Sequence, residues 1–125
     1  MEQGLISVIL PIWKPNFIQL KQCIDSLINQ TYGHQEIIII YRKSEIHDND
    51  FFELINQYND ERLKVIIGKK TGFTNSLNEG ILIASGKYIA RIDADDYCEL
   101  NRFEKQLNFK EKTKSDIVGS WGYSI

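Results

Sequence analysis

Three aspartates follow a short apolar stretch late in the chain, and their spacing is suited to chemistry. Lys87–Ile92 has the character of a strand, and Asp93, Asp95 and Asp96 come directly after it. Carboxylates this close repel one another unless a positive charge lies among them. In an extended chain Asp93 and Asp95 point to the same side, where their hard oxygens can share Mg²⁺ or Mn²⁺ with the phosphates of a ligand. The spacing therefore predicts a divalent-metal site, with a solvated acidic turn as the alternative.

The composition limits the classes to which the chain can belong. Its 125 residues fit one domain, 42% of them are hydrophobic, 26% are charged, and the formal net charge is -2. Without a basic excess, no nucleic acid is expected as a partner. The longest apolar run, Ile37–Tyr41, is too short to cross a bilayer. Cys23 and Cys98 lack the spacing of a metal site, so we expect two free thiols in a reducing compartment.

Apolar runs alternate with amphipathic stretches along the chain. The runs are rich in β-branched residues, which is typical of buried parallel strands. The stretches between them repeat apolar residues every three or four positions, as helices do. Asn16 is the expected N-cap of the first helix, and Pro11 is expected to end the first strand. Strands are predicted at Leu5–Leu10, Glu36–Tyr41, Leu63–Ile67, Tyr88–Ile92 and Asp116–Trp121, and helices at Asn16–Ile28, Asp48–Tyr58, Phe73–Ala84 and Asn101–Lys112.

This alternation predicts an α/β fold, a mostly parallel sheet with helices on both faces and right-handed crossovers. In such sheets ligands collect at the carboxyl ends of the strands. The loops at 11–13, 41–44, 68–72 and 93–96 should therefore share one rim. Two other classes with this alternation are disfavoured. A receiver domain needs acids where Pro11–Trp13 and Gly68–Lys70 stand, and a nucleotidyltransferase needs a glycine-rich loop after the first strand.

Six short segments, in order and across nearly the whole chain, resemble one known family. They are Ser7–Pro11, Ser26–Tyr32, Glu36–Ile40, Asn75–Gly80, Gly86–Ile89 and Asp93–Asp96. Together they are similar to the nucleotide-sugar-binding half of a family 2 glycosyltransferase, which has the Rossmann-like GT-A fold. The Ser76–Gly80 form is similar to that of bacterial enzymes that transfer hexoses in capsule or lipopolysaccharide synthesis.

The resemblance implies a UDP- or GDP-sugar donor whose diphosphate is gripped by a divalent metal, Mn²⁺ or Mg²⁺. By this resemblance Asp95 is the first candidate for the metal ligand, and Asp93 should lie near the ribose or share the metal. Asp96 could instead cap or brace the loop. The nucleotide is expected to contact Pro11, Trp13, Tyr41, Asn75 and Asp93. The implied reaction is inverting transfer of a hexose to a glycan acceptor in surface polysaccharide synthesis, in the cytoplasm or at the inner face of the membrane.

The chain departs from the family pattern after the second strand. The family commonly has two acids, glycine and serine there, and the first acid often contacts the base, whereas this chain has Tyr41–Ser44. Tyrosine cannot accept hydrogen bonds as a carboxylate does, so base recognition must differ. Lys14 stands where the family usually has asparagine and is placed to reach a phosphate, and Leu77 stands where many members have arginine.

The family places its general base well beyond the metal loop, so we expect that residue after Ile125. Residues 1–125 are therefore expected to be one donor-binding domain, a fragment that lacks the half that binds the glycan acceptor. The alternative is a truncated or degenerate, non-catalytic domain with weak or no nucleotide binding. Apolar sheet surface that the absent half would cover also predicts a homodimer.

Overall fold

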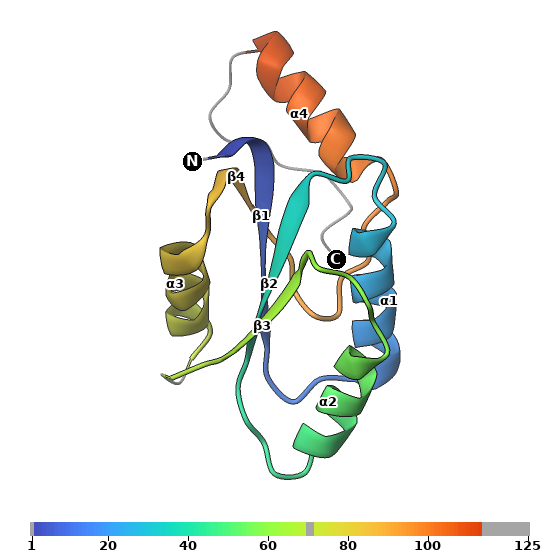
Figure 1. Ribbon diagram of the computed structural model, residues 1–125, viewed down its shortest axis with the longest axis vertical. Coiled ribbons are helices and arrows are strands. Elements are labelled where there is room, and N and C mark those ends of the chain that lie inside the picture. The colour runs from blue at the N-terminus through green and yellow to red at the C-terminus, as the bar shows by residue number, and fades with distance from the viewer. Residues whose placement is uncertain (1, 70–71, 114–125) are drawn as a thin grey trace.

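Four parallel strands form the sheet on which the candidate site is built. The computed structural model describes residues 2–69 and 72–113. The strands are β1 (Glu2–Ile12), β2 (Gln35–Tyr41), β3 (Leu63–Ile67) and β4 (Gly86–Arg91), in the order β3-β2-β1-β4 (Figure 1). All pairings are parallel, so the carboxyl ends of the strands meet at one edge. The predicted α/β fold with a mostly parallel sheet is confirmed.

Helices cover both faces of this sheet. α1 (Phe17–Ile28) and α2 (Asp48–Asn56) pack on one face, and α3 (Phe73–Ile83) packs on the other (Figure 1). α4 (Arg102–Thr113) follows the loop after β4 and adds Phe103 to the core on the α1 side. Asn16 caps α1 as predicted, since its side-chain oxygen accepts a hydrogen bond from the Gln19 amide at 3.1 Å.

No helix in the described ranges combines the length and the apolar character that a membrane crossing requires.

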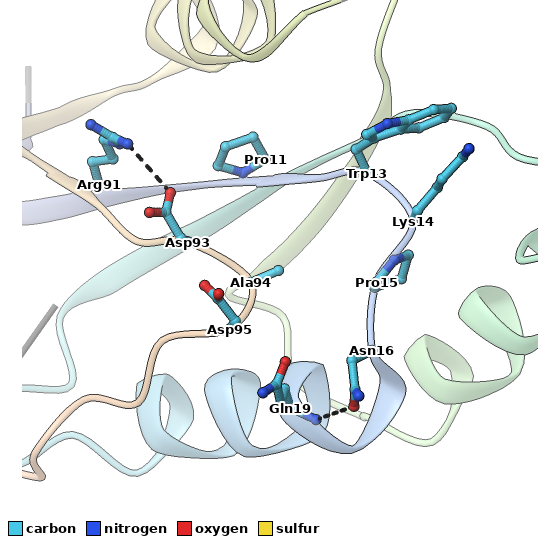
Figure 2. A pocket seen from close by; sticks show the side chains of 10 residues that line it. All are labelled: Pro11, Trp13, Lys14, Pro15, Asn16, Gln19, Arg91, Asp93, Ala94 and Asp95. Carbon is cyan, nitrogen blue, oxygen red and sulfur yellow. Dashed lines mark hydrogen bonds and ion pairs between the residues drawn. The ribbon is translucent and has the colours of Figure 1, made fainter. Parts of the chain in front are cut away.

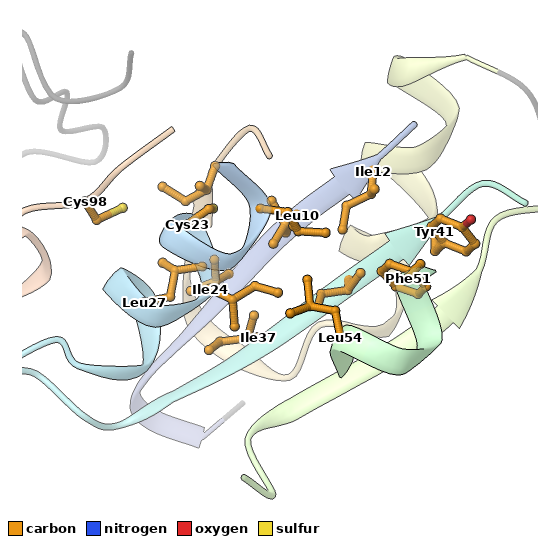
Figure 3. Packing of buried hydrophobic residues seen from close by; sticks show 14 of the residues in the cluster. Leu10, Ile12, Cys23, Ile24, Leu27, Ile37, Tyr41, Phe51, Leu54 and Cys98 are labelled. Carbon is orange, nitrogen blue, oxygen red and sulfur yellow. The ribbon is translucent and has the colours of Figure 1, made fainter. Parts of the chain in front are cut away.

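The central strands are apolar throughout because neither of their faces meets water. Every residue of β2 is buried. Ile37 and Ile39 join the core beneath α1 and α2 (Figure 3), whereas Ile38 and Ile40 join the smaller core beneath α3. Consecutive side chains of a strand point to opposite faces, so a strand covered on both faces needs an uninterrupted run of isoleucines.

The first strand is longer than predicted, and the expectation that Pro11 ends it was wrong. β1 continues through Pro11 to Ile12. The Ile9 carbonyl accepts a hydrogen bond on the β4 side, whereas the Ile12 carbonyl accepts one from the Arg42 amide on the β2 side. By this alternation the nitrogen of Pro11, which has no hydrogen, faces the β4 side. β4 ends at Arg91, opposite Ile9, so no β4 residue lies beside Pro11. The proline therefore leaves no carbonyl of a neighbouring strand without its donor.

The predicted strand Leu63–Ile67 coincides with β3, and the other predicted elements in the described ranges differ from the observed ones by one or two residues at an end. β4 covers Gly86–Arg91 instead of Tyr88–Ile92, and α2 ends at Asn56 instead of Tyr58. Such shifts are ordinary, because the ends of elements depend on contacts outside them. The predicted strand Asp116–Trp121 lies outside the described residues.

Two glycines of the family-like segments stand where no side chain fits. A Cβ on Gly80 of α3 would lie 2.7 Å from the Ile9 side chain and 2.8 Å from that of Ile40. A Cβ on Gly86 would lie 2.6 Å from the Ser7 hydroxyl oxygen. The first glycine lets α3 sit close against the sheet, and the second lets β4 begin beside β1.

A buried polar cluster ties these elements together on the α3 face. Glu36 is 4% exposed and accepts hydrogen bonds from the Ser7 hydroxyl at 2.5 Å, the Ser85 amide at 2.7 Å and Lys64 Nζ at 2.8 Å. The Gly86 amide donates to Ser7 Oγ at 2.8 Å. Burial alone would raise the pKa of Glu36, but these hydrogen bonds outweigh it and lower the pKa from 4.5 to about 2. The cluster joins β1, β2 and β3 to the start of β4.

Replacing Glu36→Gln should therefore destabilise the chain by about 1–3 kcal/mol at pH 7, because charged hydrogen bonds to a buried group are lost. Glu36 has a lowered pKa when folded, so its contribution is present above pH 4.5 and disappears as the pH falls toward about 2. The difference in unfolding free energy between the native chain and the variant should shrink over that range. Urea unfolding monitored by circular dichroism measures it.

Glu61→Gln is the matched control, because Glu61 is exposed on the turn before β3. It should change the unfolding free energy by less than about 0.5 kcal/mol. A Glu36→Gln difference that stayed constant from pH 5 to pH 2 would show that the cluster stabilises through shape and not through charge.

Candidate functional site

The ends of β1 and β4 enclose a cleft of about 560 Å³ at the carboxyl edge of the sheet. One wall is the loop from the end of β1 to the start of α1, and the other is the acidic loop after β4 (Figure 2). The side chains that line it are Pro11, Trp13, Lys14, Pro15, Asn16, Gln19, Arg91, Asp93, Ala94 and Asp95. The structure thus brings together five of the residues singled out from the sequence, namely Pro11, Trp13, Lys14, Asp93 and Asp95.

Asp96 holds the acidic loop in shape. Its carboxylate accepts a hydrogen bond from the Asp93 amide at 3.0 Å, and its own amide donates to the Asp93 carbonyl at 2.9 Å. Asp96 is only 4% exposed, and burial, reinforced by the Asp93 and Asp95 charges, raises its pKa. This is the bracing role that the sequence left open for Asp96. The other two aspartates are thereby held at the mouth of the cleft.

The carboxylates of Asp93 and Asp95 project into the cleft (Figure 2). One oxygen from each, with one from Asp96, lies within 4.8 Å of the others. Asp95 is exposed, and Asp93 lies 3.5 Å from Arg91 Nη2. That ion pair is exposed on both sides and therefore weak. The donor set consists of hard oxygens, as Mg²⁺ and Mn²⁺ prefer, so these residues fit a divalent cation.

The amino end of α1 forms the opposite wall. Asn16 and Gln19 both line the cleft, and α1 begins at Phe17. The first amides of a helix carry partial positive charge and lack partners within the helix. The Asn16 side chain satisfies the Gln19 amide. The carboxylates after β4 thus face the positive end of α1 across the cleft. This arrangement suits an anion that contacts the helix end on one side and a cation held by the carboxylates on the other.

Lys14 has a left-handed backbone conformation in the same loop. Its φ is 47°, the only positive φ among non-glycine residues in the described ranges. Asparagine adopts this conformation more readily than other residues with a side chain. In this chain the position therefore has a backbone that suits asparagine better than lysine. The Lys14 ammonium lies 4.9 Å from the centre of the Trp13 ring, at the edge of the cleft.

Tyr41 and Asn75 do not line this cleft. Tyr41 is fully buried, its ring stacks on Phe51 at 3.8 Å, and its hydroxyl donates to Asp48 at 2.6 Å. Burial and the Asp48 carboxylate raise the pKa of Tyr41, so the group stays a neutral donor. Asn75 lies exposed in the first turn of α3. Their nucleotide contacts stay predictions, and the Tyr41 ring is turned to the core.

Sequence reasoning missed three residues that shape the rim. Arg42 lies over the Trp13 ring, Arg91 pairs with Asp93, and Asp48 accepts hydrogen bonds from the Tyr41 hydroxyl and the Ser44 amide. Arg91 could have been found, because residues two apart on a strand share a face. The positions of Arg42 and Asp48 depend on contacts between different elements, which the sequence pattern does not show.

A family model described as glycosyl transferase family 2 matches residues 7–125. The chain belongs to this family. An uncharacterized glycosyltransferase of Haemophilus influenzae is 43% identical over 94 residues, which are 74% of this chain and 29% of that relative. The resemblance deduced from the six segments is therefore confirmed.

Solved structures of two glycosyltransferases share the fold of this family 2 chain, which is the predicted GT-A fold. S. aureus TarS in complex with UDP-GlcNAc has a TM-score of 0.73 at 21% identity, over 96% of this chain and 36% of that one. Mannosyltransferase PcManGT from Pyrobaculum calidifontis, in complex with GDP-Man and Mn²⁺, has a TM-score of 0.73 at 16% identity, over 91% and 33%. The chain spans about a third of the length of these proteins.

Relieving the backbone conformation at Lys14 should stabilise this family 2 chain. Lys14→Asn is expected to raise the unfolding free energy by about 1 kcal/mol, because asparagine tolerates the left-handed region better than lysine does. Urea unfolding gives the difference. Lys43→Asn serves as the control, since Lys43 is an exposed cation of the neighbouring loop with an ordinary backbone. A loss of stability in Lys14→Asn alone would show that the contact between Lys14 and Trp13 outweighs the backbone cost.

Proposed function

We propose that the cleft binds the diphosphate of a nucleotide-sugar donor together with a divalent cation, Mn²⁺ or Mg²⁺. Asp95 and Asp93 would hold the cation. The observation that carries the proposal is that their carboxylates and the amino end of α1 line one cleft from opposite sides. A diphosphate lying between them would meet the metal on one side and the partial positive charge of the helix on the other.

The comparisons support the class of donor. TarS is described in complex with UDP-GlcNAc, and PcManGT in complex with GDP-Man and Mn²⁺. Both are nucleoside-diphosphate sugars, and both proteins share the fold of this chain. The H. influenzae relative is itself named a glycosyltransferase. A UDP- or GDP-sugar is accordingly the donor that we assign to the cleft.

The reaction we propose is inverting transfer of a hexose to a glycan acceptor in surface polysaccharide synthesis. When bound, the cation supplies positive charge that offsets the charge growing on the departing diphosphate. The chain's own residues orient this centre. Asp96 fixes the loop through the Asp93 amide, and Arg91 places a positive charge 3.5 Å from the Asp93 carboxylate. We assign no general base among the described residues, so that role stays with the family-based prediction.

Two further features bear on where and how the chain works. Cys23 and Cys98 are free and buried, and burial raises the pKa of both thiols. Buried, protonated thiols suit a reducing compartment, so we place the chain in the cytoplasm or at the inner face of the membrane. Apolar side chains of α3 and β4, namely Ile81, Leu82, Ile83 and Ile89, are about half exposed or more, which supports the predicted homodimer.

Calorimetric titration of UDP and GDP, with and without Mn²⁺, tests the donor site. Binding heat should require the metal, and Asp95→Asn should weaken metal-dependent binding by about 100-fold, because a direct ligand is lost. Asp50→Asn is the matched control, since Asp50 is exposed on α2 and lies outside the cleft. It should bind as the native chain does.

The same titration distinguishes a donor-binding domain from a non-catalytic domain with weak or no nucleotide binding. If neither nucleotide binds with any metal while the chain remains folded by circular dichroism, the donor-binding function is refuted. If binding occurs but is the same in Asp95→Asn, the aspartates do not hold the metal and the site must lie elsewhere.

A further inference from the structure

Arg42 occupies the rim position next to the buried Tyr41. Its amide donates to the Ile12 carbonyl at 3.0 Å, so its backbone is fixed between the ends of β1 and β2. Its guanidinium carbon lies 3.9 Å from the centre of the Trp13 ring. This distance is that of a guanidinium stacked on an aromatic face, which holds the long side chain in one place.

A small pocket adjoins this pair and continues from the main cleft. It has a volume of about 160 Å³ and is lined by Pro11, Ile12, Trp13, Arg42 and Ser76. Pro11 and Trp13 line the main cleft as well. The volume is below the roughly 300–1,000 Å³ of a site for a whole ligand, so the pocket suits one ring of a larger molecule. A ligand whose diphosphate lies beside Asp95 could extend into it.

The donors of the Arg42 guanidinium are available to such a ring. The Arg42 side chain stacks on Trp13. It has no hydrogen-bond or ion-pair partner among residues 2–69 and 72–113. A stacked guanidinium keeps its N–H groups in its own plane, directed away from the ring beneath it. The pair therefore presents a fixed fork of donors at the rim.

We propose that Arg42 recognises the base of the donor nucleotide and selects guanine over uracil. This inference rests on the proposed donor function. Guanine presents O6 and N7 as adjacent acceptors, which match the fork of an arginine. Uracil separates its two carbonyl oxygens by an N–H donor, which would face the donors of Arg42. Trp13 supports the guanidinium from below, and both residues line the pocket. The Arg42 cation would thus contact the base in the loop where family members commonly use a carboxylate.

Calorimetric titration of GDP, UDP and ADP in the presence of Mn²⁺ measures this selectivity. The native chain should bind GDP at least about tenfold more tightly than UDP or ADP, since adenine replaces the O6 acceptor by a donor. Arg42→Ala should weaken GDP binding by about 10- to 100-fold and leave UDP nearly unchanged. Arg42→Lys keeps the charge but loses the fork, so it should not restore GDP binding. Lys43→Ala, at the exposed neighbouring cation, should behave as the native chain.

Pyrophosphate with Mn²⁺ is the probe that separates the base from the diphosphate. Its binding should be equal in the native chain and in Arg42→Ala. Three results would each overturn this inference and leave the donor site standing. The first is an equal loss of pyrophosphate and GDP affinity in Arg42→Ala, and the second is full GDP binding by Arg42→Lys. The third is equal affinity of the native chain for GDP and UDP. Failure of every nucleotide to bind would overturn both. Thermal unfolding of each variant confirms that it is folded.

Discussion

Parallel pairing of β1 with β4 is the constraint on which the site depends. The register sets Ile9 opposite Arg91, so Asp93, two residues further on, leaves the sheet at the level of Pro11 in β1. The Glu36 cluster holds the other end of this pairing through Ser7 and the start of β4. A slip of one residue would turn every β4 side chain to the opposite face. The cleft therefore exists only in one register, and that register is held by buried hydrogen bonds far from it.

Three aspartates of the same loop have different environments, and these decide what each can do. Asp96 is buried and uses its carboxylate on the backbone of the loop. Asp93 is partly exposed beside Arg91, and Asp95 is exposed at the mouth of the cleft. One acid is thus withdrawn from solvent and braces the loop that carries the other two. The division of roles comes from burial and hydrogen bonding, since the residue type is the same.

The end of β2 shows how this chain departs from its family without losing the fold. Tyr41 fills a core position, where it stacks on Phe51 and donates to Asp48. Its neighbour Arg42 has the opposite orientation and lies over Trp13 at the rim. Consecutive residues of a strand alternate between faces, so the aromatic residue packs in the core while the cation lines the small pocket beside the cleft. Of the two positions that hold acids in many family members, the first is here a core residue, Tyr41, and the second is a rim residue, Arg42.

The sequence by itself determined the parallel sheet and the family, and it located the acidic loop that carries Asp93 and Asp95. Strands buried on both faces require uninterrupted β-branched runs, and amphipathic helices require apolar residues every three or four positions, so both leave a local record. Only the tertiary structure decided that Tyr41 is buried while Arg42 lies at the rim, and that β1 runs on through Pro11. These outcomes depend on strand register and on contacts between segments tens of residues apart. No local pattern encodes such contacts, because either orientation of a strand end satisfies the same spacing.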